Sequence, residues 1–353
     1  MSYSDFAKSY ELKLLGNTIP TSKNTTFLNP RYSSSDEHLN ISPLIENPTP
    51  YLYEKINLSI NNKGVEARPF KSQYIDKTAR QDTNLAERMM GINRMLHSTD
   101  QLKNHAVSFH TTSGRTTNFG LGLTSIKKKY WPYILDPALG YRYILLDYSS
   151  QEPAIAACLA GDKGLQVAYR HGDLYQHIGR HPDLDGLDRG TLKQLVLPYS
   201  YGQSPEAYAR EHGIPLSAAQ RRWNALREIF HLVDVELNHR SQQAFRDGFV
   251  RSLDWAARVT PLSNPLAVRN WPVQACGADI MRRAVIGLHE AGIDLRLTIH
   301  DAFLIRVPIA EQEHQVAKAI TVLKQASASV LGGFELNVKI DGVFDGQVSE
   351  GMM

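Results

Sequence analysis

The sequence predicts an α+β protein in which one sheet carries a large inserted block of helices. Apolar runs typical of strands occur in "YRYILLDY" at 141–148, at 295–307 and near 334–344. The stretch from about 166 to 255 has the pattern of helices, and so do 273–291 and 311–330. Strands on both sides of a helical stretch indicate a single sheet domain with an insertion.

This order of elements divides the chain into four parts. They are an N-terminal region that is partly irregular (1–100), the first part of the sheet domain (101–165), the helical insertion (166–255) and the second part of the sheet domain (256–353). Residues 1 to about 80 are polar and rich in Ser, Asn and Pro, with at most a short strand at 53–60. A stripe typical of a core-facing helix follows, formed by Leu85, Met89, Ile92 and Leu96.

Composition excludes several classes of protein. With 42% hydrophobic and 21% charged residues, the 353-residue chain resembles ordinary soluble proteins, and a net charge of +3 is compatible with a nucleic-acid partner without indicating one. The two cysteines, Cys158 and Cys276, exclude a disulfide framework and a CxxC metal site. The N-terminus lacks an apolar signal core and no run approaches a membrane span, so we expect a cytoplasmic protein and no membrane partner.

The run "LRLTIHDAFLIRV" at 295–307 is expected to form one buried β-strand. His300 and Asp301 lie in its middle. An ionised carboxylate in an apolar strand costs free energy unless another group pairs with it. We therefore expect Asp301 to have a specific partner that offsets its charge.

A second apolar run, Ile144 to Leu146, is followed directly by Asp147. If both strands share one sheet, Asp147 and Asp301 lie side by side and can hold divalent ions such as Mg²⁺, which prefer carboxylate oxygens. Two such ions stabilise the attacking and the leaving oxygen of a phosphoryl transfer. The residues alone leave a second interpretation open, in which each Asp simply ends a strand or caps a turn.

The segment "DRGTLKQLVLPYSYGQ" predicts a helix over 188–202 with an unusual face. Arg189, Lys193, Leu197 and Tyr201 follow one another at steps of four, and Gly202 closes the run. Such a face suits a nucleoside triphosphate, because the two cations can bind its phosphates and the apolar and aromatic end can contact its flat base. An amphipathic surface helix remains the alternative.

Five motifs, which follow one another along the chain in the family's order, resemble the polymerase domain of family A DNA polymerases over roughly residues 105–345. "DYSSQE" is similar to the family's DYSQIE, and the helix is similar to R-x3-K-x3-[FY]-x3-YG. "NWPVQACGAD" resembles N-x-P-x-Q-G-x-A-A-D, "HDA" at 300–302 resembles HDE, and "TSGRTTN" resembles the TGRLSS loop. The resemblance implies a right-hand polymerase fold, with an antiparallel palm sheet and an inserted helical fingers subdomain.

The resemblance also implies template-directed addition of deoxynucleoside triphosphates to primer–template DNA, with two Mg²⁺ ions for which Mn²⁺ can substitute. The implied metal ligands are Asp147, Asp301 and the backbone carbonyl of Tyr148, and Lys193 joins the two aspartates as a catalytic residue. The implied nucleotide-binding residues are Arg189, Lys193, Leu197, Tyr201, Gly202, Glu152 and Tyr175, with Asp173 beside Tyr175. The implied contacts to the primer terminus and minor groove are Arg115, Asn270, Gln274 and His300.

The chain departs from the family pattern at three positions. Ala302 stands where the family has Glu, Leu197 replaces an aromatic residue, and Pro198 is expected to kink the helix. About 100 residues precede the GRT loop, so we expect a reduced thumb, no 3′–5′ exonuclease, and an accessory protein or domain that replaces the thumb. The basic run 127–129 fits either a phosphate contact or a solvated loop.

Two other functions remain open from the sequence. A single-subunit RNA polymerase or ribonucleotide-tolerant enzyme agrees with Leu197 and Ala302, whereas Glu152 and the NWPVQ segment favour DNA synthesis. A non-catalytic nucleic-acid-binding descendant agrees with the small N-terminal region and Ala302. The joint presence of Asp147, Asp301, Arg189 and Lys193 argues against it.

Overall fold

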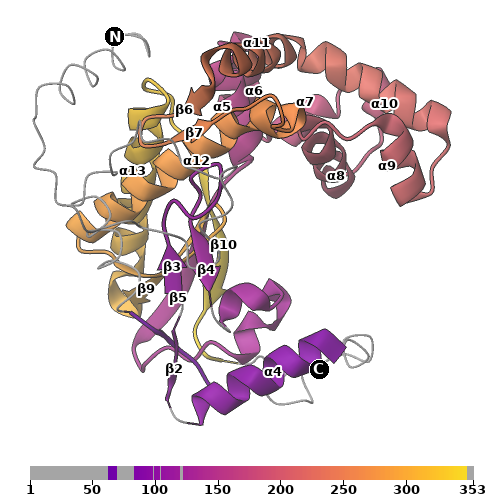
Figure 1. Ribbon diagram of the computed structural model, residues 1–353. Helices are drawn as coiled ribbons and strands as arrows, with labels where there is room; N and C mark the ends of the chain where they lie inside the picture. Colours follow the sequence, from indigo (N-terminus) through magenta and orange to yellow (C-terminus); the bar gives the residue numbers. More distant parts are fainter. Residues whose placement is uncertain (1–62, 70–82, 98, 104, 120–121, 348–353) are drawn as a thin grey trace, which may run out of the picture.

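A four-stranded antiparallel sheet forms the centre of the molecule (Figure 1). The computed structural model describes residues 63–69, 83–97, 99–103, 105–119 and 122–347. The strand order is β10-β5-β9-β8, with bounds Val338–Phe344, Tyr141–Tyr148, Ala302–Pro308 and Asp294–Ile299. Strands from both sides of the helical insertion therefore share one sheet, and the predicted mixture of helices and strands is confirmed.

Both faces of this sheet are covered, which explains why its strands read as continuous apolar runs. Successive side chains of a strand point to opposite faces. Ile144 and Leu146 pack into the core that includes α12 (Pro265–Glu290) and α13 (Gln312–Val330). Tyr143 and Leu145 pack into a second core with α4 (Thr83–Leu96) and the 3₁₀ helices η3 (Leu123–Ser125) and η4 (Lys128–Tyr133).

The prediction of one strand over 295–307 is wrong. The segment forms a hairpin in which Ile299 pairs with Ala302, and the two residues of its turn are His300 and Asp301. The turn requires a positive φ of 52° at His300, a conformation that few residues other than glycine adopt. Asp301 therefore lies at the end of the sheet, beside the last residues of β5, and not inside a strand.

A block of helices lies between β5 and the other three strands of the central sheet along the chain. It contains α5 (Gln151–Leu159), α6 (Lys163–His171), α7 (Leu174–Ile178), η5 (Pro182–Leu184), α8 (Arg189–Ser200), α9 (Pro205–His212), α10 (Leu216–Ile229) and α11 (His231–Asp247). A small hairpin follows, made of β6 (Phe249–Arg251) and β7 (Ala256–Arg258). The next helix, α12, begins at Pro265 and not near Val273, because Asn264 caps it and Pro272 is tolerated inside it.

The described N-terminal residues attach to the sheet at two places. Helix α4 buries Met89, Ile92 and Leu96, as their spacing predicted. Strand β1 (Val65–Glu66) pairs with β2 (Gln101–Leu102), and β3 (His105–Val107) pairs with β4 (Thr117–Phe119). Helix α4 and β1 pack at the end far from Asp301, whereas Asn118 of the β3–β4 hairpin donates to the Thr298 carbonyl of β8 at 2.9 Å. Most of residues 1–100, including the strand expected at 53–60, lie outside the described ranges, and so does most of the expected reduced thumb.

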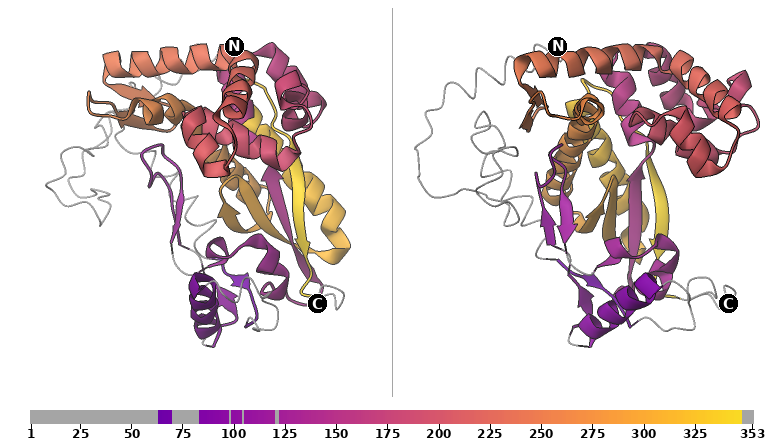
Figure 2. Two further views of the ribbon diagram at one scale, coloured as in Figure 1. Left: turned by 90° about the vertical axis from the view of Figure 1, so that its right-hand side faces the viewer. Right: turned by 45° about the vertical axis from the view of Figure 1, so that its right-hand side comes forward.

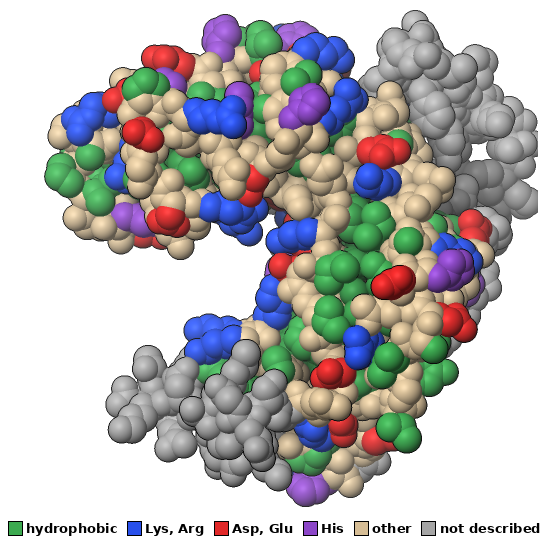
Figure 3. All heavy atoms as spheres, turned by 180° about the vertical axis from the view of Figure 1, so that it is seen from behind, with side chains coloured by type: hydrophobic (Ala, Val, Ile, Leu, Met, Phe, Trp, Pro, Cys, Tyr) green, Lys and Arg blue, Asp and Glu red, His purple; other side chains and the backbone are tan. Residues whose placement is uncertain are grey.

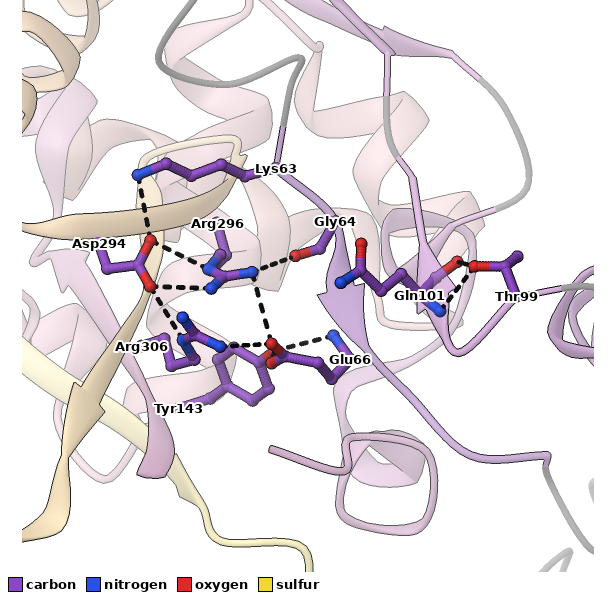
Figure 4. A network of polar contacts seen from close by, with 9 residues as sticks. All are labelled: Lys63, Gly64, Glu66, Thr99, Gln101, Tyr143, Asp294, Arg296 and Arg306. Atoms are coloured by element: carbon purple, nitrogen blue, oxygen red, sulfur yellow. Dashed lines mark hydrogen bonds and ion pairs between the residues drawn. The ribbon is translucent and has the colours of Figure 1, made fainter. Parts of the chain in front are cut away.

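A network of charged side chains fixes β1 to the sheet (Figure 4). Asp294 accepts from Arg296 and from Arg306 at 2.9 Å each, and from Lys63 at 3.1 Å. Glu66 also pairs with Arg306 and accepts from the Tyr143 hydroxyl. Ion pairs therefore tie β1, β8 and β9 together at this end of the sheet, and the Tyr143 hydrogen bond adds β5.

The helical insertion and α4 lie at opposite ends of the sheet, and the molecule is open between them (Figures 1 and 2). The space-filling view shows this opening as a wide hollow with Lys and Arg side chains along its wall (Figure 3). Within the described ranges, none of the helices combines the length and the apolar character that crossing a membrane requires.

Candidate active site

Asp147 and Asp301 meet at one end of the central sheet. Asp147 is the next-to-last residue of β5, and its register partners are Ala302 on β9 and Lys339 on β10. The backbone N–H of Tyr148 donates to the carbonyl of Asp301 at 3.2 Å, which holds the hairpin turn against β5. Burial, and next the charge of Asp147, raise the pKa of Asp301 to about 7. Two residues more than 150 positions apart thus form one acidic site.

Two lysines neutralise part of this acidic charge. The Lys339 ammonium lies 3.0 Å from Asp147 Oδ2, and the charge of Lys193 on α8 lowers the pKa of Asp301. Lys193 was predicted from its place in the helix. Lys339 was not, because its position opposite Asp147 follows only from the pairing of β10 with β5.

The pair of carboxylates fits a hard divalent cation in its donor chemistry. Adjacent like charges in a partly buried site raise the pKa of one of them, as they do for Asp301, and a divalent cation removes that repulsion. No cluster of three or more His, Cys, Asp or Glu side chains suited to a metal occurs among the described residues. Further ligands would therefore have to be backbone carbonyls, water or substrate oxygens.

The start of α8 holds Arg189 in an ion pair. Asp188 caps the helix through the N–H groups of Gly190 and Thr191. The Arg189 guanidinium pairs with Asp173 and lies 5.3 Å from the centre of the Tyr175 ring. Tyr175 is buried, and burial raises the pKa of its hydroxyl to about 12. Asp173, Tyr175 and Arg189 thus form one cluster, and Lys193 is exposed one turn further along α8.

Glu152 and three other predicted residues form one cluster, and each of the four comes from a different part of the chain. The Tyr201 hydroxyl donates to Glu152 at 2.8 Å and 2.9 Å, and Arg115 pairs with the same carboxylate. Gln274 of α12 also hydrogen-bonds the Tyr201 side chain. Burial and the Glu152 charge raise the pKa of Tyr201. Glu152 is therefore held in place from two sides.

The end of α8 depends on Gly202. Its φ is 81°, and an added Cβ would lie 2.6 Å from Cδ2 of Leu266. Helix α8 continues for two residues beyond Pro198, and the N–H of Tyr201 donates to the Leu197 carbonyl at 3.1 Å. The glycine therefore allows the turn that places Tyr201 beside Glu152.

Asn270 and His300 occupy different surroundings. Asn270 is 3% exposed, and within the described part of the chain its Nδ2 has no hydrogen-bond partner. It lines a small cavity behind Glu152 together with Arg269. His300 is exposed in the hairpin turn next to Asp301. Asn270 is therefore buried beside Glu152, whereas His300 is open to solvent.

Sequence reasoning missed the group that positions the Arg115 loop. Arg282 of α12 is 2% exposed, donates to the carbonyl of Gly114 at 2.7 Å, and lies 4.0 Å from the centre of the Phe109 ring. It also pairs with Asp279, which is completely buried. The Asp-x-x-Arg spacing on one helix could have indicated the pair, but nothing in the sequence links it to Gly114.

The basic run 127–129 has intramolecular partners. Lys128 pairs with Asp341, and the Lys129 ammonium lies 4.9 Å from the centre of the Tyr130 ring. Whether this run contacts phosphates stays a prediction.

Comparisons with known proteins agree on one family. The family model described as DNA polymerase family A matches residues 125–342, more than half of the chain. The chain is 28% identical over 196 residues to the DNA polymerase of Mycobacterium phage L5, covering 55% of this chain and 32% of that protein. It is 27% identical over 325 residues to DNA polymerase I of Pseudomonas aeruginosa, covering 79% of this chain and 35% of that protein.

A likeness in fold accompanies these matches. The polymerase domain of Pol1 from M. smegmatis, solved in complex with DNA primer-template and dNTP, superposes with a TM-score of 0.63 at 23% identity. The likeness covers 75% of this chain and 51% of the other. The chain spans about a third of the length of these two curated relatives.

Proposed function

The chain belongs to DNA polymerase family A, as its motifs predicted, and on this premise we propose that it adds deoxynucleotides to a primer 3′ end under the direction of a template. One observation carries the proposal. Asp147 and Asp301 lie side by side at the end of the sheet, with Lys193 of the motif helix acting on Asp301 through its charge. Primer–template DNA and deoxynucleoside triphosphates are the partners that this reaction requires.

In this proposal the sheet is the palm of a right-hand polymerase and the helical insertion is the fingers. The palm consists of residues 101–165 and 256–353, and the fingers consist of residues 166–255. The N-terminal region 1–100 corresponds to a reduced thumb. The hollow between the helical insertion and α4, with Lys and Arg side chains along its wall, is the expected place of the DNA duplex (Figure 3).

Asp147, Asp301 and the carbonyl of Tyr148 are the proposed holders of divalent ions. Family A polymerases generally use divalent metal ions, and such ions supply charge stabilisation for the attacking and the leaving oxygens. Lys193 and Arg189 then bind the triphosphate, because each carries a fixed positive charge on the same face of α8. Asp173 and Tyr175 orient the Arg189 guanidinium through an ion pair and a ring contact.

Glu152 is the proposed selector for deoxyribose. Its carboxylate is fixed by Arg115 and Tyr201, so it has little freedom to move away from a ribose 2′-hydroxyl. Tyr201, with Leu197 before it and Gly202 after it, forms the surface for the nascent base pair. Arg115, Gln274, Asn270 and His300 are the proposed contacts to the primer terminus and minor groove.

Primer extension tests this function. We expect the purified chain to extend a labelled primer on a DNA template with Mg²⁺ and deoxynucleotides, to prefer deoxynucleotides over ribonucleotides, and to stop when EDTA is added. Without nucleotides, the primer should stay intact, since we propose no proofreading exonuclease. A preference for ribonucleotides would support the RNA polymerase alternative, and DNA binding without any extension would support a non-catalytic descendant.

A further inference from the structure

Lys339 connects the candidate metal site to a row of charges that neither the motifs nor the proposed reaction accounts for. Its ammonium lies 3.0 Å from Asp147 Oδ2 and 3.2 Å from Asp341 Oδ1. Lys128 of η4 pairs with Asp341 on the other side. Charges therefore alternate in sign along the row Asp147, Lys339, Asp341 and Lys128.

The backbone of β10 produces this arrangement. Lys339 is the register partner of Asp147, so both side chains emerge on the same face of neighbouring strands. The register then shifts between Ile340 and Gly342, which leaves Asp341 without a partner on β5. Such a bulge re-aims a side chain, and here the Asp341 carboxylate reaches the Lys339 ammonium.

The Lys339 ammonium is hydrogen-bonded to Asp147 Oδ2, an oxygen that a bound cation would need as a ligand. Among the described residues, Asp147 and Asp301 are the two carboxylates assigned to the metal site, and Ala302 contributes none. An ammonium at 3.0 Å engages Oδ2 as a charge-assisted hydrogen bond and offsets the negative charge that attracts a metal. A divalent ion bound to both oxygens of Asp147 would have to move this ammonium away.

Lys339 is free to move in this way. Its side chain is 42% exposed, whereas the Asp147 side chain is 16% exposed, so the lysine can swing outward while the aspartate stays in place. Asp341 remains as a second partner for the displaced ammonium. Displacement therefore costs one ion pair and not two.

We propose that Lys339 is a built-in counter-ion of the metal site, which a divalent cation displaces from Asp147 when it binds. This inference rests on the proposed function, because it requires Asp147 to be a metal ligand. Lys339 thereby weakens metal binding to the free protein and offsets part of the acidic charge until a cation binds.

Metal binding by the free protein tests the inference without any measurement of activity. Mn²⁺ is titrated into the full chain, without DNA or nucleotide, and the free ion is measured by electron paramagnetic resonance. We expect Lys339→Gln to bind Mn²⁺ about fivefold more tightly than the wild type, since a half-exposed ion pair contributes up to about 1 kcal/mol. Thermal unfolding of each variant checks that the fold is kept.

Two lysine variants serve as matched controls. Lys128→Gln removes a charge from the same row without touching Asp147, and Lys324→Gln removes a charge of similar exposure from α13. Both should change Mn²⁺ affinity by less than about twofold, because charges at a distance are screened. An equal gain in Lys128→Gln, or an unchanged or weaker affinity in Lys339→Gln, overturns the inference.

Asp147→Asn separates failure of this inference from failure of the proposed function. If Asp147→Asn loses Mn²⁺ binding while Lys339→Gln binds as the wild type does, only the role of Lys339 is overturned. If Asp147→Asn binds as tightly as the wild type, or if neither the wild type nor Lys339→Gln binds Mn²⁺, the metal site and the proposed function both fail.

Discussion

At the scale of single residues, the clearest consequence of the site is the protonation of Asp301. Its pKa lies at about 7 in the folded protein, against an ordinary value of 3.8, because of burial and next the charge of Asp147. The folded protein therefore keeps this proton up to about pH 7, whereas the unfolded chain releases it near pH 4. The contribution of Asp301 to the free energy of unfolding falls as the pH rises through this window.

We predict that Asp301→Asn weakens this pH dependence, because the amide does not titrate. Urea denaturation with EDTA present, at pH 5 and at pH 8, measures the free energy of unfolding of both proteins. The variant should gain stability relative to the wild type at pH 8, where Asp301 is ionised, and less at pH 5. The same change from pH 5 to pH 8 in both proteins would contradict the assignment of the titration to Asp301.

Glu152 carries a second prediction at this scale. We expect Glu152→Ala to accept ribonucleotides about tenfold or more better relative to deoxynucleotides, a difference of roughly 1.4 kcal/mol, because the fixed carboxylate no longer fills the space of a 2′-hydroxyl. The ratio of kcat/KM for the two nucleotide classes measures this change. Glu152→Gln keeps the size of the side chain, so it should retain most of the discrimination. Equal relaxation in both variants would show that charge, and not volume, selects the sugar.

At the scale of elements, α12 fixes the loop that carries Arg115. We predict that Arg282→Met lowers the free energy of unfolding by about 3–5 kcal/mol, because it leaves the buried Asp279 carboxylate unpaired. Arg240→Met is the matched control, since Arg240 and its partner Glu236 are each about 30% exposed. That control should cost about 1 kcal/mol or less. Urea denaturation compares the two, and equal losses would contradict a special role for Arg282.

The elements differ in how well the sequence predicted them. Helix α8 was predicted almost to its bounds, because its step-of-four pattern and Gly202 are both local signals. The hairpin at 294–308 was missed, because its turn is His300–Asp301 and not a pair such as Asn-Gly that favours a positive φ. The helix expected at 273–291 begins earlier, at Pro265, because Asn264 caps it and the helix tolerates Pro272.

Much of the candidate site could be predicted from motifs, but its partners could not. Arg115, Glu152, Tyr201 and Gln274 were each chosen from separate motifs, and they meet in one cluster. Lys339 lies in no motif, and its contact with Asp147 depends on the pairing of strands nearly 200 positions apart. Such long-range pairing leaves no local signal in a single sequence.

At the scale of the whole molecule, the order of strands and helices along the chain was enough to predict one sheet with a helical insertion. The strands are apolar on both faces because each face packs into its own core. In β5, Ile144 and Leu146 face α12 and α13, whereas Tyr143 and Leu145 face α4. The opening between the insertion and α4 was not predictable, because it depends on how separate elements are oriented in space (Figure 2). The sheet places Asp147 and Asp301 together at the end where the charge of Lys193, on α8 of the insertion, acts on Asp301.

The central claim is that Asp147 and Asp301 together carry nucleotidyl transfer. Single-turnover primer extension by Asp147→Asn and by Asp301→Asn tests it most directly, with binding of primer–template measured on the same samples. Asp136→Asn is the matched control, since Asp136 is an exposed aspartate that pairs with Arg68 away from the site. We predict that each site variant loses extension by about a thousandfold or more, roughly 4 kcal/mol, while DNA binding stays within about threefold and the control remains active. Extension near the wild-type rate by either site variant would contradict the claim.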